Sequence, residues 1–429
     1  MLFQRKPWQE ELDIVDKTMK AISSVTDPED MVDTYWQGIG ELLPIGDFVA
    51  LSRRGVQPPH FLVTRSSRFT EEINPWTQRD RLPRLSGGLL GEIAFAGKPL
   101  IMRDLKARLR EDDPGWFYLQ GFESLIALPQ YDNGEALNVT CMLLPAGLEP
   151  DPSMIPILHW QSGLFGRGTQ NLVLRNQLAT ALNTLDRELQ VVGEIQRSLL
   201  PSRLPEIPGF DLAAFYQTSA RAGGDYYDFF PLDQGRWGVL IADVAGHGTP
   251  AAVLMAITRA VAHAQPAMQA HPHALLTHLN SELTKSYTRE GTFITAFYAV
   301  IDPASRKLSY ASAGHNPPRL ARRGRVLGLD ELADLPIGID PGVSYGKAEC
   351  PLERGDFLLM YTDGITEAMP PRDGNAHREM FGVERVDKVL LEHGENAAGA
   401  IEHIRADVDE FSEHGQPSDD QTLVAVRSL

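Results

Sequence analysis

The sequence is poor in cysteine, has fewer basic than acidic residues, and lacks any long hydrophobic run. Its only cysteines, Cys141 and Cys350, stand far apart in 429 residues, which argues against a structural disulfide or a cysteine metal site and favours a reducing compartment. Lysine and arginine total 40 against 57 acidic residues, a net charge of −17, so neither nucleic acid nor a membrane is an expected partner. The opening stretch MLFQRKPWQEELDIVDK has no apolar signal-peptide segment, and no run is long enough to span a bilayer. We expect a cytoplasmic protein.

What is present is the composition of a globular protein. Hydrophobic residues make up 43% of the chain and charged residues 23%, and the length suits two or three domains with full cores. The pattern divides into three blocks, residues 1–167, 168–200 and 201–429.

The first block alternates short helical and strand patterns. A helix is expected over Trp8–Ser24, and the acidic stretch TDPED predicts the start of a second helix. Strands are expected at DFVALSRR and HFLVTRSS, with a further pair, SLIALPQ and LNVTCMLLP, around the turn YDNGEA.

Three features of this block resemble a GAF domain: the stretch LLGEIAFAGKPLIMRDL, the SLIALPQ strand after it, and a helix that leads out. The resemblance implies a sensory α+β domain with helices on one side of an antiparallel sheet, responding to an unknown small-molecule or protein signal. A PAS-type sensor and a plain α+β domain without a ligand are the alternatives. The block has no matched cysteine and histidine cluster that would suggest a bound metal or haem.

The second block, residues 168–200, reads as a single helix that ends at Pro201 and Pro205. Its apolar residues alternate spacings of four and three: Leu178, Leu182, Leu185, Leu189, Val192 and Leu199. Gln196 occupies the remaining position of this seam. A period of 3.5 residues predicts a two-stranded parallel coiled coil, and hence a homodimer. The alternative is a connector helix that packs on its own domains.

The third block, residues 201–429, is dense in strand patterns with helices in separate runs. We expect helices over Thr249–Ala264, Pro272–Tyr287, Val383–Leu391 and Ala397–Phe411, and a final strand in DDQTLVAVRSL. Many antiparallel strands with separated helices predict an α+β sandwich covered by helices.

Acidic residues stand at the ends of four apolar strands in the third block. Asp225 precedes an aromatic strand, Asp243 ends GVLIAD, Asp363 ends FLLMYTD, and Asp419 and Asp420 open the final strand. Any one of them could cap a turn, but an unpaired carboxylate at a buried sheet edge is costly. If the strands are neighbours, the carboxylates converge. Oxygen ligands without His or Cys suit Mg²⁺ or Mn²⁺ rather than Zn²⁺.

Two such ions, about 3.5–4 Å apart, can hold a water molecule, lower its pKa and direct it at a phosphorus atom. The stretch VLIADVAGHGTPAAVLMA fits the phosphate-binding motifs poorly. It lacks the lysine of a P-loop, and its acid precedes the glycines, whereas a dinucleotide fingerprint carries its acid about 20 residues after them. Thr249 and Pro250 are suited to begin the following helix.

An ordered series of motifs is similar to the metal-dependent Ser/Thr protein phosphatases (the PPM or type 2C superfamily), in their SpoIIE-like branch. The motifs are EIQRSLLPSRLP, GGDYYDFF, IADVAGHGTPAA, TFITAFYAVID, YASAGHNPP, LPIGI, LLMYTDGITEA and SDDQTLVAV. The resemblance implies a β-sandwich flanked by helices, with two Mn²⁺ or Mg²⁺ ions at one end.

Carried over by motif, Asp225 and Asp243 would be the catalytic metal ligands, with Asp243 bridging both ions. The backbone carbonyl of Val244, Asp363 and Asp419 would complete the site, although the motif leaves the choice between Asp419 and Asp420 open. Asp228 is a further nearby acid, and neither it nor Asp420 is expected to bind metal directly.

The sequence departs from the eukaryotic branch at two positions. Ala245 replaces the histidine thought to protonate the leaving group, and His247, two residues later, is better explained as packing on the turn. No clear phosphate-binding arginine is present; Arg221 is a candidate, with a surface salt bridge as its default role. His315 and Asn316 match a family motif and are expected to hold a loop near the site.

The resemblance implies a phosphoserine or phosphothreonine protein phosphatase regulated by its sensor, with no covalent enzyme intermediate. Its substrate would be a phosphorylated anti-sigma-factor antagonist in a partner-switching pathway that frees a sigma factor. Two alternatives remain: a catalytically silent, signal-dependent docking module on the phosphatase fold, and a small-molecule phosphate hydrolase.

Overall fold

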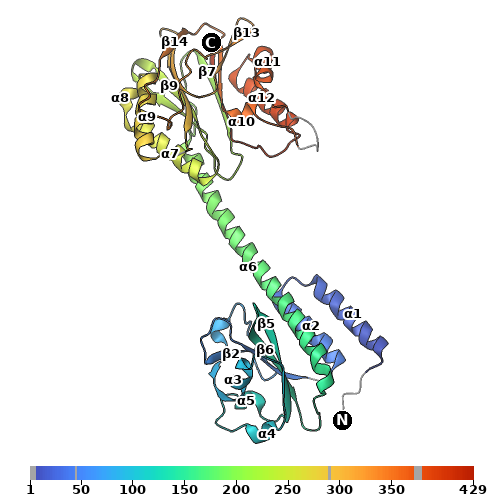
Figure 1. Ribbon diagram of the computed structural model, residues 1–429. Helices are drawn as coiled ribbons and strands as arrows, with labels where there is room; N and C mark the ends of the chain where they lie inside the picture. Colours follow the sequence, from blue (N-terminus) through green and yellow to red (C-terminus); the bar gives the residue numbers. More distant parts are fainter. Residues whose placement is uncertain (1–5, 44–45, 288–290, 372–378) are drawn as a thin grey trace. The chain divides into compact units, whose positions relative to one another are not determined.

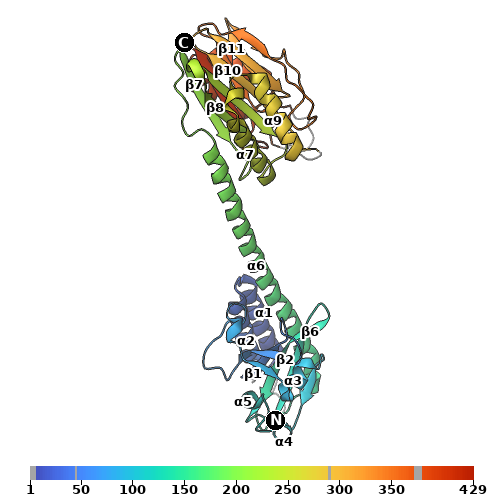
Figure 2. The same cartoon turned by 90° about the vertical axis from the view of Figure 1, so that its left-hand side faces the viewer.

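The structure is a computed structural model that describes residues 6–43, 46–287, 291–371 and 379–429. The chain forms two compact units, Met1–Asn183 and Thr184–Leu429. Helix α6 (Ile155–Leu199) begins in the first unit and ends in the second (Figures 1 and 2). No helix in the described part of the chain is both long enough and apolar enough to cross a bilayer.

The N-terminal unit is built on one six-stranded antiparallel sheet. The strand order is β3-β2-β1-β6-β5-β4, so the long β5–β6 hairpin lies beside β1. The strands are β1 (Asp47–Ser52), β2 (His60–Ser66), β3 (Arg84–Ser86), β4 (Leu100–Met102), β5 (Ser124–Asp132) and β6 (Glu135–Leu144).

Helices cover both faces of this sheet, so the expectation of helices on one side is wrong. The first face packs on α3 (Gly88–Phe95), α4 (Leu105–Arg108) and α5 (Trp116–Leu119), and the second on α2 (Pro28–Leu42) and the start of α6. The physical cause is in β5. Leu125 and Ala127 join the first core, whereas Ile126 and Leu128 join the second. A strand that is apolar at every position needs cover on both sides.

The helices at the N-terminus and the linker show one agreement and one difference. Helix α1 spans Trp8–Ser24, as predicted, and lies against α2. Helix α6 begins at Ile155, earlier than the predicted residue 168. Its extra turns bury Leu158 against the second face of the sheet, next to Met154, which directly precedes the helix, so this part of the helix belongs to the core of the N-terminal unit.

The C-terminal unit is a sandwich of two five-stranded sheets. The strand orders are β14-β11-β10-β9-β8 and β13-β12-β15-β16-β7. The first sheet contains β8 (Tyr226–Pro231), β9 (Trp237–Val244), β10 (Ile294–Asp302), β11 (Lys307–Ala313) and β14 (Ala348–Pro351). The second contains β7 (Phe210–Gln217), β12 (Arg319–Arg322), β13 (Arg325–Gly328), β15 (Phe357–Tyr361) and β16 (Gln421–Ser428).

Helices flank the sandwich on its outer faces, as predicted (Figure 1). The first sheet is covered by α7 (Thr249–Ala264), α8 (Pro266–Gln269) and α9 (Pro272–Ser286). The second is covered by α10 (Asp363–Thr366), α11 (Val383–His393) and α12 (Ala397–Phe411). Strand β15 shows the layering directly, because Leu358 and Met360 face the other sheet while Phe357 and Leu359 face the helices.

The C-terminal end of α6 packs on its own unit through Gln196, so the placement of this residue in a dimer seam is wrong. The side chain is 3% exposed. Its Nε2 donates to the carbonyl of Gly223 (2.6 Å) and to the hydroxyl of Tyr216 (3.0 Å), and its Oε1 accepts from the Gly223 N–H (2.9 Å). Leu178, Leu182 and Leu185 are exposed, and a dimer through them stays a prediction.

Candidate active site

The acidic strand ends of the two sheets meet at one end of the sandwich. Asp243 lies at the end of β9, and Asp225 immediately precedes β8, the neighbour of β9. Asp363 begins α10 directly after β15, and Asp419 lies just before β16, which pairs with β15. The convergence predicted from the sequence therefore follows from the pairing within each sheet and the stacking of one sheet on the other.

Asp225 is the most enclosed of these acids and is bonded across the sandwich. It is 1% exposed. Its Oδ2 accepts hydrogen bonds from the hydroxyls of Thr362 (2.7 Å) and Thr422 (2.5 Å), both on the opposite sheet. Burial, and then the charge of Asp243, raises the pKa of Asp225 well above its ordinary value, against the effect of the two hydroxyl donors.

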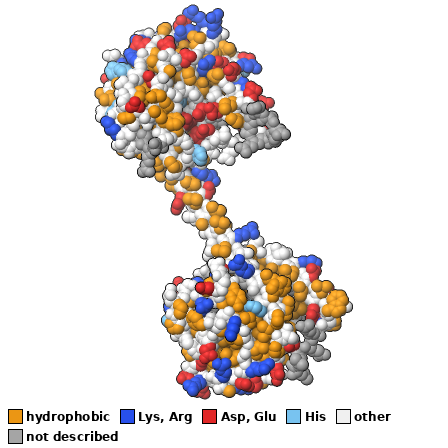
Figure 3. Space-filling model, viewed as in Figure 1, with side chains coloured by type: hydrophobic (Ala, Val, Ile, Leu, Met, Phe, Trp, Pro, Cys, Tyr) orange, Lys and Arg blue, Asp and Glu red, His pale blue; other side chains and the backbone are white. Residues whose placement is uncertain are grey.

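The other acids of the cluster disfavour one another's ionisation. Burial, followed by the charges of Asp363 and Asp419, raises the pKa of Asp243 to about 7. Burial and the charge of Asp419 raise the pKa of Asp363 to about 6, and burial also raises the pKa of Asp419. A divalent cation among these carboxylates would relieve the repulsion that each exerts on the next. Figure 3 shows acidic side chains gathered on one face of the C-terminal unit.

The donor set fits a hard cation. Within the described ranges, no three His, Cys, Asp or Glu side chains already have the spacing of an ion-binding cluster, so the fit rests on the chemistry of the donors and on the shape of the site. A Cβ atom at Gly224 would lie 2.7 Å from the carbonyl oxygen of Val244. The glycine therefore brings the loop before Asp225 close to this carbonyl. Carboxylate and carbonyl oxygens are ligands that Mg²⁺ and Mn²⁺ accept.

Asp420 anchors a loop. It is 4% exposed, and its carboxylate accepts from the N–H of Gly224 (2.6 Å) and from the N–H (2.8 Å) and hydroxyl (3.1 Å) of Ser219. These bonds fix residues 219–224, the segment that leads into Asp225. Of the two neighbours in the DD motif, Asp420 thus has a structural role, and Asp419 is the better candidate ligand.

Asp228 faces away from the cluster and toward α7. Its carboxylate accepts from the hydroxyl of Tyr226 (2.6 Å) and lies 2.8 Å from His263 Nε2 and 3.7 Å from Arg259 Nε. This network, buried at Tyr226 and Asp228 and open to solvent at His263, joins β8 to α7 and agrees with the expectation that Asp228 does not bind metal directly.

His315 is buried next to the strand residue that pairs with Asp243. It is 6% exposed, and its Nδ1 lies 2.8 Å from the hydroxyl of Thr295, which pairs with Asp243 across β9 and β10. Burial lowers the pKa of His315 to about 4, so the imidazole is neutral near pH 7. These contacts suit the predicted role of holding a loop.

Arg221 and His247 hold outer positions. Arg221 makes a two-pronged ion pair with Asp186 of α6 (2.9 and 3.0 Å), which is the surface salt bridge expected by default. His247 is exposed, and its charge acts to lower the pKa of Asp419.

The residues that sequence reasoning missed are those that hold Asp225 in place. Thr362 and Thr422 are fully buried, although Thr362 directly precedes Asp363 and Thr422 follows Asp420 by two residues. Thr422 is visible in the sequence as a hydroxyl residue within the apolar run of the last strand. Its hydrogen bond to Asp225 is not visible there, because the contact joins segments of two different sheets.

The C-terminal unit is similar to known proteins. Residues 233–428 match the family model of the stage II sporulation protein E (SpoIIE). The phosphoserine phosphatase RsbU of Bacillus subtilis is 27% identical over 242 residues, covering 56% of this chain and 70% of RsbU. The phosphoserine phosphatase RsbP of the same organism is 26% identical over 189 residues, covering 43% of this chain and 46% of RsbP. The chain thus spans less than half the length of this second relative.

The fold is also found in a solved structure. The SiaA-PP2C domain of Pseudomonas aeruginosa aligns with a TM-score of 0.52 and 24% identity, over 58% of this chain and 99% of that domain. The fold is that of a PP2C-type domain, and the similarity to RsbU and RsbP supports a serine/threonine protein phosphatase. This domain is similar to the SpoIIE family over residues 233–428. The family match includes Asp243, Asp363 and Asp419 but begins after Asp225, whose assignment rests on its contacts.

Proposed function

We propose that this protein is a metal-dependent phosphoserine or phosphothreonine protein phosphatase. The observation that carries the proposal is the convergence of Asp225, Asp243, Asp363 and Asp419 from both sheets of a SpoIIE-like domain, with raised pKa values throughout. Carboxylates that repel one another destabilise the fold, and a bound cation would offset that repulsion. The arrangement is therefore better explained by cation binding than by stability.

The residues that would hold two Mn²⁺ or Mg²⁺ ions are these four carboxylates and the carbonyl of Val244. Bound ions supply an activated water and neutralise phosphoryl oxygens, so no covalent enzyme intermediate is needed. The chain's own residues position the ligands. Thr362 and Thr422 fix one oxygen of Asp225, and the Asp420 carboxylate fixes the loop before it.

The substrate we propose is a phosphorylated anti-sigma-factor antagonist in a partner-switching pathway. The support is the similarity to RsbU and RsbP, both named phosphoserine phosphatases. A cytoplasmic location, expected from the low cysteine content, belongs to the same proposal. Both cysteines are free, as suits a reducing compartment.

We further propose that the N-terminal unit is a GAF-like sensor, that residues 168–200 link it to the phosphatase, and that the chain forms a homodimer through this helix. The exposed Leu178, Leu182 and Leu185 support the dimer. Control of activity would pass through the Gln196 contact, since Gly223 stands two residues before Asp225. A change in α6 that breaks this contact would displace a metal ligand.

The test is hydrolysis of p-nitrophenyl phosphate by the full chain while Mn²⁺ is titrated. The proposal predicts metal-dependent turnover that is lost in Asp243→Asn and Asp363→Asn. The matched control is Asp409→Asn, an exposed acid on α12 whose side chain pairs with His414, and it should hydrolyse at the wild-type rate. Turnover that persists in both site variants, or that needs no metal, would contradict the proposal. A folded protein inactive at every metal concentration would favour the docking module.

A further inference from the structure

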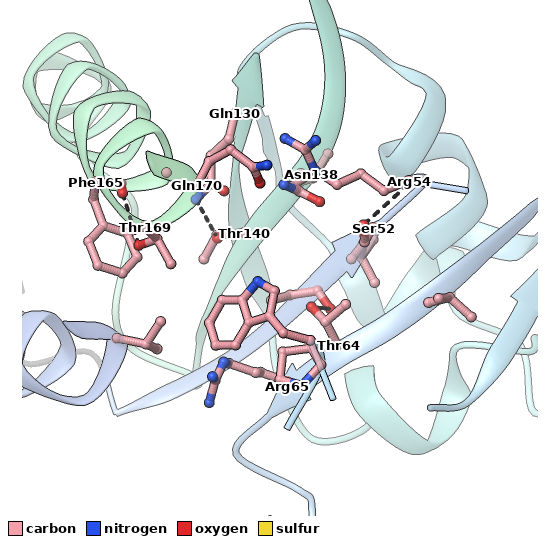
Figure 4. Close-up of a pocket in the computed structure, with 18 of the residues that line it drawn as sticks. Ser52, Arg54, Thr64, Arg65, Gln130, Asn138, Thr140, Phe165, Thr169 and Gln170 are labelled. Carbon is pink, nitrogen blue, oxygen red and sulfur yellow. Dashed lines mark hydrogen bonds between the residues drawn. The ribbon is translucent and has the colours of Figure 1, made fainter. Parts of the chain in front are cut away.

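The N-terminal unit contains a cavity of about 280 Å³ between the second face of its sheet and helices α2 and α6 (Figure 4). The volume is near the lower end of the range for small-molecule sites. In Figure 4, side chains of α6, among them Phe165, Thr169 and Gln170, lie across the cavity from side chains of the sheet. All the lining residues fall within 32–177, inside the first unit.

The sheet face that forms the cavity changes from apolar to polar side chains along its strands. Toward one end of β5 and β6 it is apolar, with Ile126, Leu128 and Met142 in the core. Two residues further along each strand the same face carries Gln130 and Thr140, which line the cavity. Alternation along a strand keeps these side chains on one face, so the change occurs within a single packing surface.

The face of helix α6 that packs on the sheet also changes from apolar to polar side chains. Leu158 belongs to the apolar core, whereas Ser162 and Thr169, one and three turns later, line the cavity and are 4% and 7% exposed. Gln130 Nε2 joins the two surfaces by donating to Thr140 Oγ1 (3.3 Å) and Ser162 Oγ (3.2 Å). Burying hydroxyl and amide groups costs free energy that a core built for packing alone would avoid.

The charge of the lining runs against that of the chain. Three described residues that line the cavity are arginines, Arg54, Arg65 and Arg79, and none of the lining residues is Asp or Glu, although the chain has a net charge of −17. Arg54 pairs with Asp132 through Nη1 (2.7 Å), and Arg65 pairs with Glu29 (2.6 Å). A guanidinium has five N–H donors, so one carboxylate contact leaves each arginine with donors for a bound anion.

Aromatic rings supply part of the apolar lining, beside aliphatic side chains such as Leu62 and Val173. Tyr35, Trp36, Trp76 and Phe165 all line the cavity, and the Arg65 guanidinium lies 5.4 Å from the centre of the Trp76 ring. Flat rings with nearby guanidinium and amide donors suit a planar ring that carries a negative group.

We propose that this cavity binds a small planar aromatic carboxylate. The ring lies among the aromatic side chains, and the carboxylate accepts hydrogen bonds from Arg54 and from the polar end of the sheet. Binding itself does not depend on the phosphatase function, whereas any effect of binding on turnover rests on that proposed function.

The experiment is isothermal titration calorimetry of the full chain with 2-naphthoate and, separately, with 2-naphthamide. The two probes share size and ring system and differ in charge. Saturable one-to-one binding of 2-naphthoate is expected, with the amide about tenfold weaker or worse, since hydrogen bonds to a charged group are the stronger ones. Absence of saturable 2-naphthoate binding in the millimolar range, or equal affinity for both probes, overturns the proposal without any variant.

Variants locate the site. Arg54→Gln should weaken 2-naphthoate about tenfold, the loss expected for one charge-assisted hydrogen bond. It leaves Asp132 with a second partner, because Arg167 Nη1 lies 3.4 Å from that carboxylate. Ser162→Phe fills the cavity and should abolish binding. Arg108→Gln, the matched control, removes an arginine that pairs with Glu92 and does not line the cavity; it should bind as wild type does. Unchanged affinity in Arg54→Gln and Ser162→Phe places the probe elsewhere and overturns the proposal.

Discussion

The contact between Gln196 and Gly223 offers a measurable link between helix α6 and the active-site loop. Gln196→Leu keeps the size of the side chain and removes all three of its hydrogen bonds. The N–H and the carbonyl of Gly223 then stay buried without their partner. Each unsatisfied buried group costs about 1–3 kcal/mol, so with two such groups the loop that leads to Asp225 should lose about 2–6 kcal/mol of local stability.

Hydrogen exchange followed by mass spectrometry measures this loss directly. Each 1.4 kcal/mol corresponds to about a tenfold change in an equilibrium constant, so amides of residues 219–225 should exchange at least about tenfold faster in Gln196→Leu. Gln190→Leu is the matched control, because Gln190 is exposed on the same helix and bonds only to Glu194 among the contacts described. Exchange in this loop that is the same in both variants would refute the reasoning.

The same variant also tests control of the site. If Gln196 holds the loop that carries Asp225, Gln196→Leu needs more Mn²⁺ for half-maximal phosphatase activity. Wild-type activity at every Mn²⁺ concentration would contradict control through this contact.

Three further predictions concern single side chains near the cluster. Thr422→Val removes a donor to Asp225 and should raise the Mn²⁺ concentration needed for half-maximal turnover, while Thr422→Ser keeps the hydroxyl and should behave as wild type does. Arg221→Gln breaks only a surface ion pair with Asp186, so it should lower the free energy of unfolding by less than about 1 kcal/mol and leave turnover unchanged. His315 contributes stability that is fully present above pH 6.5, its ordinary pKa, and is lost as the pH falls toward its folded value of about 4; the loss should reach about 3 kcal/mol in urea unfolding, and His315→Gln should lack it.

Each of these predictions can fail separately. If Thr422→Val and Thr422→Ser need the same Mn²⁺ concentration for half-maximal turnover, the Thr422 hydroxyl does not help Asp225 to bind metal. A loss of turnover in Arg221→Gln would instead support a role for Arg221 in phosphate binding. For His315, the acids of the cluster have raised pKa values and act in the opposite direction as the pH falls, so the difference between wild type and variant is the quantity to compare. A difference that does not change with pH would contradict a buried neutral imidazole.

The acidic cluster could be predicted because each acid directly follows or precedes an apolar strand. An acid at the end of an apolar run is visible in the sequence itself, and Asp243 and Asp363 stand in such places. The helices Thr249–Ala264 and Ala397–Phe411 begin and end as expected, since a cap or an abrupt change of pattern marks their ends.

What could not be predicted depends on contacts between distant segments. The spacing of Gln196 fits a dimer seam as well as it fits a buried contact with the chain's own domain, and only the position of Gly223 decides between them. The second helical layer on the N-terminal sheet was missed for a similar reason. A strand such as SLIALPQ shows no alternation of apolar and polar residues. Its sequence does not identify the elements that pack on its two faces.

We expect the acids of the C-terminal unit to bind two metal ions. Electron paramagnetic resonance tests this expectation, because the signal of free Mn²⁺ is lost when the ion binds. Titration of the full chain should show two bound Mn²⁺ ions per chain in the wild type, and fewer than two, bound more weakly, in Asp243→Asn, which removes one of the proposed carboxylate ligands. Absence of Mn²⁺ binding to the wild type, or two ions bound equally well by Asp243→Asn, would contradict the account.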